Sequence, residues 1–361
     1  MDRREFATRV AALLAAAVTG TRPAAAAPHL AKPQADRGLR AAASSLLKPP
    51  VLKSRALVGL IAPGGVVDDT IIQKCVNNLE SMGFAVKLSA NIRAAHGGYA
   101  GTVAQRLSDL HDMFRDRDVR AIWTARGGSG CTSLLPKIDY SLVRAHPKIL
   151  IGYSDITALH LALYRQARLV TFHGPVAWSS PTDYSVTQMQ AVLMNPRREM
   201  VIDMSVENEK KSQAQSQFRL RTIHAGVAEG RLVGGNLSVL AALIGTPYAA
   251  DFSRALLFLE EVGEAPYRVD RLLTQLEQSR PLRSAAGIML GVFQRGDAPV
   301  GDRSLTLEEV IDSHFGEVPI PAASGFSFGH IAHQFTIPVG IRARLDTVNN
   351  TLTLLEAGVT G

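Results

Sequence analysis

Ser154 lies where an apolar, strand-like segment changes directly into a helical pattern. Residues 148–152 lead into Tyr153-Ser154-Asp155, and apolar residues recur at helical spacing from Ile156 onward. A serine on so tight a strand-to-helix turn projects its hydroxyl from the sheet edge, and the backbone N–H of Asp155 lies at a helix N-terminus, where negative charge is stabilised. Attack on a carbonyl needs both a nucleophile and such a donor. The alternative is that Ser154 and Asp155 only cap the helix, since both residue types are favoured N-caps.

A serine nucleophile needs a base, and the base needs an acid that orients it. Of the ten histidines, His330 lies between a strand-like segment and Pro338, so we expect it on a loop, where catalytic side chains are commonly presented. Glu260 ends an apolar strand, where a carboxylate is costly unless it is hydrogen-bonded. Glu261 and Glu264 follow it closely. The alternative for all three acids is a solvated position at the edge of a loop.

Two other patterns near these residues are candidate ligand sites. His330 and His333 form a candidate metal pair, but their spacing lacks the helical, Glu-containing pattern of a zinc hydrolase. The Gly-rich run 126–130 lacks the Lys-Ser/Thr ending of a phosphate-binding loop and the spacing of a dinucleotide fingerprint. In a serine hydrolase, the backbone of Gly127 or Gly128 would instead supply the second oxyanion donor. We expect no metal site.

The composition fits a globular protein with two domains. The chain has 361 residues, and 46% of them are hydrophobic. Its formal net charge is +7, of which residues 1–27 hold +2, and the remaining +5 is scattered along the chain. A nucleic-acid-binding surface would have a basic stripe with aromatic residues in it. The sequence has no such stripe, so we expect no nucleic-acid partner. Cys75 and Cys131 lack metal or redox spacing, and either a disulfide or two isolated buried thiols fits them.

The N-terminus has the pattern of a secretory signal. Residues 1–27 combine a charged start, a short apolar run and a small-residue cleavage zone. Arg3-Arg4 resembles a twin-arginine signal, which directs export after folding. The apolar run is too short to span a bilayer core of about 30 Å. We therefore expect a signal peptide at 1–27, a tether at 28–53 and a periplasmic mature protein without stable membrane association.

Strand-like and helical segments alternate over residues 54–178. The sequence predicts strands at 56–62, 85–88, 119–125 and 169–172, and helices at 70–82, 103–115 and directly after Gly130. Such alternation predicts a Rossmann-like α/β domain whose parallel sheet binds ligands at its carboxyl edge. The turns at Pro63, Gly127 and Ser154 all fall at that edge.

The second half of the chain has a different pattern. Residues 179–220 are polar and lack sustained periodicity, which we interpret as an inter-domain crossing. Residues 221–361 predict a smaller, mixed α+β, sheet-rich domain that carries the acid and the base. Its expected elements are helices at 237–244 and 267–278, strands at 255–259 and 287–291, and a hairpin over 339–355 that turns at Asn349-Asn350.

A set of short motifs occurs in order from about residue 55 to residue 345. They are Ala62-Pro63-Gly64, Arg126-Gly127-Gly128, Gly152-Tyr153-Ser154-Asp155, His173-Gly174-Pro175, Gly234-Gly235-Asn236-Leu237, Leu259-Glu260-Glu261, Pro266-Tyr267-Arg268-Val269-Asp270-Arg271, and Gly329-His330 with Gln334 and Pro338-Val339-Gly340. In this order they resemble the LD-carboxypeptidases, or muramoyltetrapeptide carboxypeptidases, whose relatives include the microcin C immunity peptidases. The resemblance implies a two-domain serine peptidase, usually a homodimer, that requires no cofactor.

The resemblance also implies roles for particular residues. Ser154 would be the nucleophile, His330 the general base and Glu260 its orienting acid. Glu261 stands where an Asp is common in the family, so Glu260 is the expected acid and Glu261 a minor rival. The oxyanion hole would be formed by the backbone N–H of Asp155 and of a glycine in the Gly127-Gly128 pair. The implied substrate is a murein tetrapeptide, which is cut between the L-centre of a diaminopimelate and the terminal D-alanine.

Three matters remain open in the sequence. Members of the recycling type are often cytoplasmic, whereas this chain carries an export signal, so it either recycles internalised muropeptides or trims stem peptides in the periplasm. Arg126 and Arg268 are both candidates to bind the terminal carboxylate of the substrate. The alternatives to the carboxypeptidase are an exported peptide- or glycan-binding protein without catalysis and a microcin C immunity-type peptidase.

Overall fold

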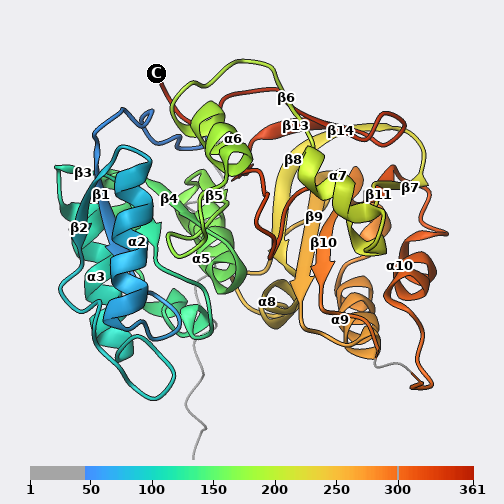
Figure 1. The fold of residues 1–361 in the computed structure, drawn as a ribbon, viewed down its shortest axis with the longest axis horizontal. Helices are drawn as coiled ribbons and strands as arrows, with labels where there is room; N and C mark the ends of the chain where they lie inside the picture. The colour runs from blue at the N-terminus through green and yellow to red at the C-terminus, as the bar shows by residue number, and fades with distance from the viewer. Residues whose placement is uncertain (1–44, 299–300) are drawn as a thin grey trace, which may run out of the picture. The chain divides into compact units, whose positions relative to one another are not determined.

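Short apolar strands separated by helices build a parallel sheet from the first half of the chain (Figure 1). The computed structural model describes residues 45–298 and 301–361. The first sheet has the strand order β12-β5-β4-β3-β1-β2. Its strands are β1 (Leu57–Ile61), β2 (Ala85–Leu88), β3 (Val119–Thr124), β4 (Ile149–Gly152), β5 (Thr171–His173) and β12 (Ile337–Val339). The first five run parallel, and β12 from the far end of the chain pairs antiparallel with β5.

Helices and short helical turns connect these strands. They are α2 (Asp69–Ser81), α3 (Val103–Arg115), η1 (Cys131–Ser133), η2 (Leu135–Lys137), α4 (Tyr140–Ala145), η3 (Ser154–Ile156), α5 (Thr157–Ala162) and η4 (Leu163–Ala167). Helix α3 begins at a capping box, because Thr102 and Gln105 each bond the other's backbone N–H. Its buried face carries Leu110, Met113 and Phe114. Local capping and one apolar face thus explain why this helix forms and which side it buries.

The second half of the chain folds into a larger, mixed sheet. Its strand order is β6-β14-β13-β8-β9-β10-β11-β7. The strands are β6 (Met200–Ile202), β7 (Arg221–His224), β8 (Val227–Asn236), β9 (Ala255–Val262), β10 (Gly287–Gln294), β11 (Ala322–Ser324), β13 (Arg342–Asp346) and β14 (Thr351–Leu354). Strands β8 to β11 are parallel, and the outer pairs are antiparallel. The carboxyl end of β9 carries Glu260, and the loop between β11 and β12 carries His330.

The remaining helices lie in the crossing segment and around the second sheet. They are α6 (Asp183–Leu193), α7 (Val206–Ser212), η5 (Ser216–Phe218), α8 (Leu237–Ala242), α9 (Pro266–Ser279), η6 (Leu282–Ser284) and α10 (Leu307–Phe315). The segment 179–220, whose sequence lacks sustained periodicity, therefore contains the α-helices α6 and α7, the 3₁₀ turn η5 and strand β6. Strand β6 extends the second sheet at one edge.

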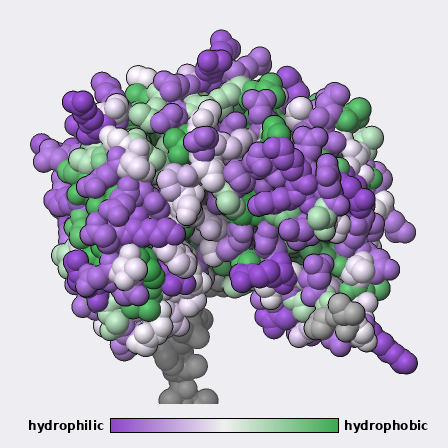
Figure 2. All heavy atoms as spheres, viewed as in Figure 1, coloured by the Kyte–Doolittle hydropathy of each residue, from purple (hydrophilic) through white to green (hydrophobic). Residues whose placement is uncertain are grey.

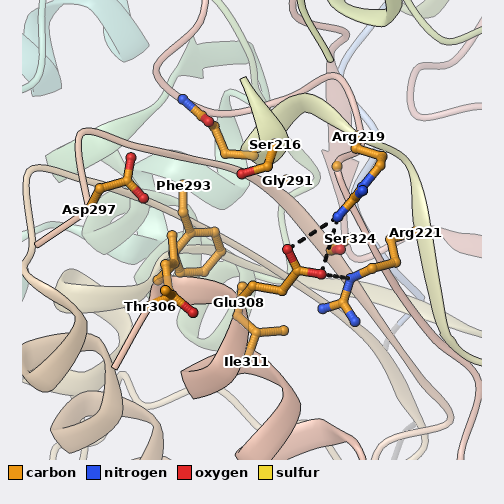
Figure 3. Close-up of a pocket in the computed structure, with 13 residues that line it drawn as sticks. Ser216, Arg219, Arg221, Gly291, Phe293, Asp297, Thr306, Glu308, Ile311 and Ser324 are labelled. Atoms are coloured by element: carbon orange, nitrogen blue, oxygen red, sulfur yellow. Dashed lines mark hydrogen bonds and ion pairs between the residues drawn. The ribbon is translucent and has the colours of Figure 1, made fainter. Parts of the chain in front are cut away.

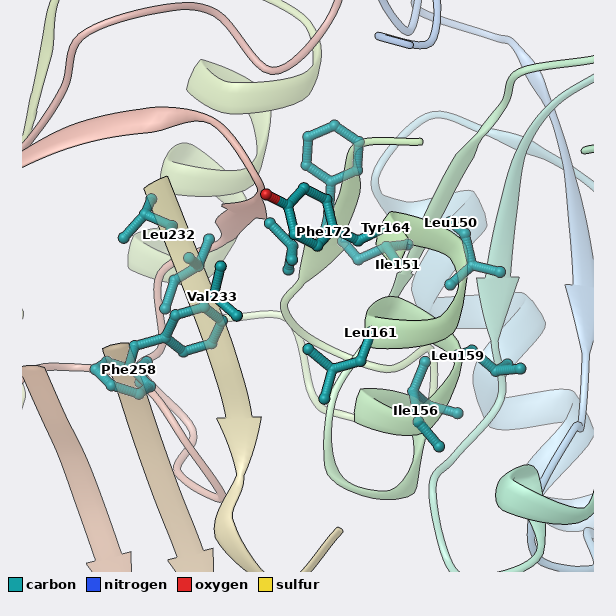
Figure 4. Packing of buried hydrophobic residues seen from close by; sticks show 14 of the residues in the cluster. Leu150, Ile151, Ile156, Leu159, Leu161, Tyr164, Phe172, Leu232, Val233 and Phe258 are labelled. Carbon is teal, nitrogen blue, oxygen red and sulfur yellow. The ribbon is translucent and has the colours of Figure 1, made fainter. Parts of the chain in front are cut away.

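One continuous hydrophobic core joins the two sheets. Figure 4 shows Leu161 of α5 and Phe172 of β5 on one side of this core, with Val233 of β8 and Phe258 of β9 on the other. All four side chains are fully or almost fully buried. The two sheets are therefore held together by packing.

The described surface is largely hydrophilic on the face shown in Figure 2, with small groups of apolar residues among the polar ones. No helix within residues 45–298 and 301–361 is long and apolar enough to cross a membrane. The predicted signal peptide and residues 28–44 of the predicted tether lie outside the described residues. The rest of that segment packs on the protein, and Leu52 is only 1% exposed. Cys75 and Cys131 are both buried free thiols.

The predicted fold class is confirmed: a Rossmann-like parallel sheet is followed by a mixed, sheet-rich part. Strand 85–88 and helix 103–115 have the predicted limits. Several other predictions were wrong in their limits; in particular, the hairpin strand expected from Val339 begins at Arg342, because Val339 ends β12 of the first sheet. Strand β5 begins at Thr171, two residues later than predicted, and the helix expected directly after Gly130 consists of two short 3₁₀ turns before α4.

Candidate active site

Ser154 occupies a strained turn between β4 and α5. Tyr153 is extended, whereas Ser154 has a φ of +67°, in the left-handed region that is costly for a residue other than glycine. Neither the 3₁₀ turn nor helix α5 has a side-chain cap, and the carboxylate of Asp155 instead accepts the backbone N–H of Cys131 at 2.9 Å. The alternative that Ser154 and Asp155 only cap the helix is therefore not what the structure shows.

Glycines allow the neighbouring strands to approach this turn. A Cβ atom at Gly127 would lie 2.7 Å from the Cβ of Ser154 and 2.9 Å from its Oγ, so only glycine fits there. A Cβ at Gly152 would lie 2.2 Å from the hydroxyl of Thr124. The same position at Gly127 is 3.2 Å from the backbone nitrogen of Asp155. The Gly-rich loop and the Asp155 N–H thus meet beside the Ser154 hydroxyl, which is the arrangement an oxyanion hole needs.

An arginine braces the loops that form this edge. Arg106 of α3 is 3% exposed, and its guanidinium donates to the carbonyl of Pro63 at 2.8 Å and to that of Gly130 at 3.0 Å. Gly65 donates its N–H to the carbonyl of Gly127 at 2.9 Å. The loops after β1 and β3 are therefore tied to each other and to α3. Sequence reasoning missed Arg106, because its partners are backbone carbonyls that leave no residue signature.

His330 and Glu260 form a buried pair at the carboxyl edge of the second sheet. The Nδ1 atom of His330 lies 2.7 Å from Oε2 of Glu260, whose side chain is 0% exposed. Burial alone raises the pKa of the Glu260 carboxyl, but the charge and hydrogen bond of His330 outweigh it and hold that pKa below its usual value. An ionised carboxylate only accepts hydrogen bonds, so Nδ1 carries the proton, and Nε2 of the neutral imidazole is free to act as a base.

Aromatic packing brings the serine turn and the histidine together. The ring of Tyr153, which directly precedes Ser154, packs edge-on against the imidazole of His330, with centroids 4.8 Å apart. Among the described residues, no hydrogen bond joins the Ser154 hydroxyl to His330. Catalytic hydrogen bonds are often long in unliganded proteins and tighten with substrate. The structure thus brings the serine turn that follows β4 next to the late loop carrying His330, which is hydrogen-bonded to Glu260 of β9.

Glu261, the rival acid, points to different partners. Its carboxylate accepts from Nδ2 of Asn236 at 3.0 Å and from the backbone N–H groups of Ser238 at 2.7 Å and Val262 at 2.8 Å. Asn236 in turn caps α8 through the N–H of Val239. Burial raises the pKa of Glu261 above its usual value. This carboxylate anchors the start of α8 and makes no contact with the imidazole.

The candidate metal pair and the third acid have other surroundings. Among the described residues, no group of three or more His, Cys, Asp or Glu side chains could hold a metal ion, so His330 and His333 have no third ligand there. Glu264 lies beyond the strand end and forms an ion pair with Arg268 in the first turn of α9.

Two buried histidines lie beneath the site; from the sequence, His173 was named only as part of a motif and His160 was not singled out. Nε2 of His160 donates to the carbonyl of Gly152 at 2.8 Å, and its Nδ1 accepts from Thr171 at 2.9 Å. His173 packs against Tyr153 and Phe258. Burial lowers the pKa of His160 to about 3 and that of His173 to about 4. Both are therefore neutral near pH 7 and serve as uncharged packing beneath Ser154.

Because of these two histidines, we expect the folded protein to lose stability between pH 7 and pH 5, above the pH range in which carboxylates titrate. Their folded pKa values lie below the unfolded value of about 6.5, so as the pH falls below 6.5 the unfolded chain binds protons that the folded chain does not. Lowering the pH from 7 to 5 should cost about 2 kcal/mol of unfolding free energy for each histidine. Urea unfolding at the two pH values checks this. The His160→Gln protein should lose about 2 kcal/mol less than wild type over the same interval, and equal losses would contradict the prediction.

Comparison with known proteins identifies relatives across nearly the whole described chain. Residues 58–174 match the family profile described as the LD-carboxypeptidase N-terminal domain, and residues 229–345 match the profile of its C-terminal domain. A protein of Bacillus subtilis named a probable murein peptide carboxypeptidase is 37% identical over 312 residues, which cover 86% of this chain and 95% of that protein. The murein tetrapeptide carboxypeptidase of Pseudomonas aeruginosa is 34% identical over 295 residues, which cover 80% of this chain and 92% of that protein.

A solved structure agrees with these sequence matches. The crystal structure of an MccF-like protein from Bacillus anthracis superposes with a TM-score of 0.75 at 30% sequence identity. The match covers 86% of this chain and 99% of that one. Sequence profiles, curated relatives and fold therefore all indicate the same group of proteins.

Proposed function

The chain belongs to the LD-carboxypeptidase family and is a serine-type peptidase; from this premise we propose that it releases the terminal D-alanine of murein tetrapeptides. The names of its relatives in Bacillus subtilis and Pseudomonas aeruginosa support a murein peptide as the substrate. The bond cut would be the one between the L-centre of the third stem residue and the D-alanine. The signal pattern of residues 1–27 supports action on stem peptides in the periplasm.

The proposed chemistry is acyl transfer through Ser154. The Ser154 Oγ attacks the scissile carbonyl carbon while Nε2 of His330 takes its proton, and Glu260 stabilises the resulting imidazolium. The backbone N–H of Asp155 and of Gly127 or Gly128 would bind the oxyanion. His330 then protonates the amine of the leaving D-alanine. Water activated by the same imidazole hydrolyses the acyl-enzyme and restores the serine.

The observation that carries this proposal is the pairing of a strained serine turn with a buried imidazole–carboxylate pair. A left-handed serine, packed against Gly127 at a distance that only glycine allows, has no structural need to be there. Within residues 45–298 and 301–361, the fully buried Glu260 hydrogen-bonds only to an imidazole and has one oxygen without a partner, which is similarly costly to the fold. Both costs are expected where the geometry serves catalysis.

A second candidate substrate follows from the likeness to the MccF-like protein of Bacillus anthracis. In that case the same acyl-transfer residues would act on an aminoacyl sulfamoyl nucleoside, the kind of ligand in the MccF complex with aspartyl sulfamoyl adenosine. The two candidates share the nucleophile and differ in the leaving group, which is a free amino acid in one and a nucleotide derivative in the other. Only the substrate assay separates them.

Mass spectrometry of the reaction products tests the proposal. Purified protein is incubated with a murein tetrapeptide and, separately, with aspartyl sulfamoyl adenosine, and the released alanine is assayed with D-amino-acid oxidase. We expect the tetrapeptide to become a tripeptide with one equivalent of D-alanine released, and little cleavage of the nucleoside. Cleavage of the nucleoside with an intact tetrapeptide would favour the second candidate. Cleavage of neither would contradict both.

A further inference from the structure

We propose that Arg126 binds the terminal carboxylate of the substrate and so restricts the enzyme to peptides with a free C-terminus. The inference rests on the proposed function, because it requires a scissile amide next to a C-terminal carboxylate at Ser154. In such a peptide the carboxylate carbon lies about 3–4 Å from the scissile carbonyl carbon. The group that binds it must therefore lie at the rim of the nucleophile.

Arg126 lies at this rim. It directly precedes Gly127, which contacts Ser154, and it follows the end of β3. Its Nε atom is 3.5 Å from the position of a Cβ at Gly65, whose N–H bonds the carbonyl of Gly127. The side chain is half-buried. The base of the guanidinium group is thus held against the loops that flank the oxyanion donors.

Trp178 orients the guanidinium. The Cζ atom of Arg126 lies 5.3 Å from the centre of the Trp178 ring, and the backbone N–H of Trp178 donates to the carbonyl of Ala125 at 3.0 Å. The two residues are therefore fixed beside each other by both backbone and side chain. A guanidinium held over an aromatic face by a cation–π contact can still donate its N–H groups to the two oxygens of a carboxylate. Trp178 is 40% exposed, so the stacked pair is open to a ligand.

The local charge favours an anion. The Nζ atom of Lys74 lies 5.9 Å from the centre of the same Trp178 ring. The ion pairs found among residues 45–298 and 301–361 include neither Lys74 nor Arg126. Two cations that share one aromatic ring without a carboxylate partner repel each other, and an anionic ligand relieves that repulsion.

The other arginine suggested by the sequence is already neutralised. Arg268 forms an ion pair with Glu264 four residues earlier, across the start of α9. Binding a substrate carboxylate there would require breaking that pair. Arg268 therefore serves as the matched control for Arg126.

The arginines in a separate cavity are neutralised in the same way. A cavity of about 200 Å³ lies between β7, β10, β11 and α10 (Figure 3). There Arg219 and Arg221 both contact the carboxylate of Glu308, and Arg221 also pairs with Asp312 at 2.7 Å. These side chains satisfy one another within the fold. Their cavity is not a second candidate for the substrate carboxylate.

Calorimetric binding to catalytically silent protein tests the proposal without turnover. In a Ser154→Ala background, we compare a murein tetrapeptide with the same peptide ending in D-alaninamide. A bidentate, charge-assisted contact predicts that the acid binds about 30–100-fold more tightly than the amide. Adding the Arg126→Met change should weaken binding of the peptide acid by about that factor and binding of the amide by less than about threefold. The Arg126→Lys change keeps the charge but not the two parallel N–H donors of the guanidinium. Its affinity for the acid should fall between those of the parent and of the Arg126→Met protein.

Comparing the preference for the peptide acid over the amide among the variants shows which side chain contacts the carboxylate. The Arg268→Met control should keep the full preference for the acid. The proposal would be overturned if the Ser154→Ala parent bound the acid and the amide equally, or bound neither. It would also be overturned if the Arg126→Met change weakened the binding of both peptides by the same factor. Loss of the preference in Lys74→Met but not in Arg126→Met would overturn it as well. If wild type releases no D-alanine and Arg126 still discriminates acid from amide, the proposed reaction is wrong and this inference stands.

Discussion

Replacing Ser154 by alanine should lower kcat for release of D-alanine by roughly a million-fold, because a nucleophile, base and orienting acid that act as one unit lose nearly all their effect when one is removed. KM should change little, since the hydroxyl contributes to the transition state more than to binding. The rate is measured by mass spectrometry of tetrapeptide and tripeptide over long incubations.

A matched control separates chemistry from folding. Ser108 is an exposed serine on α3, and Ser108→Ala should keep wild-type activity within about twofold. The Ser154→Ala protein should unfold at a temperature close to that of wild type, because alanine retains the left-handed backbone strain of serine. A folded Ser154→Ala protein with near-native turnover would contradict the nucleophile assignment.

The Glu260→Gln change should lower kcat by roughly 10⁴-fold. The amide retains the size of the carboxylate but can donate to Nδ1 of His330, which favours the tautomer protonated at Nε2 and removes the base. It also leaves the imidazolium without a counter-charge in a fully buried site. Steady-state kinetics should show the loss in kcat and not in KM.

Glu261→Gln is the control for this second change. Its carboxylate anchors Asn236 and the start of α8, so its loss should lower the stability of the protein while kcat falls less than about tenfold. Thermal unfolding and kinetics on both variants give the comparison. A larger loss of kcat in Glu261→Gln than in Glu260→Gln would reverse the assignment of the acid.

Much of the first sheet could be predicted because its signals are local. The predicted helix at 103–115 begins at a capping box and has one apolar face, and both are visible in sequence. The Ser154 turn was predictable for the same reason, since strand, turn and helix are contiguous. The segment 179–220 was not, because α6 and α7 are short and β6 forms only by pairing with β14 from the end of the chain. Such long-range pairing leaves no local pattern.

The site was predictable where chemistry dictates residue type and unpredictable where packing does. Alternation along a strand puts Glu260 and Glu261 on opposite faces of β9, but it does not show that both faces are covered and that both carboxylates are therefore buried. Arg106 and His160 bond to backbone carbonyls, which are present at every residue and mark none of them. The environment of Arg126 depends on Trp178, 52 residues later, and only the folded chain places them together.

Covalent labelling by a serine-directed fluorophosphonate, read by intact mass and peptide mapping, asks whether an activated hydroxyl exists at the edge where the two sheets meet. We expect a single adduct on Ser154 of the wild-type protein, a much slower reaction in Glu260→Gln, and none in Ser154→Ala. A protein that stays unlabelled, as a binding protein without catalysis would, or one that carries its adduct on another serine, would show that Ser154 is not the nucleophile.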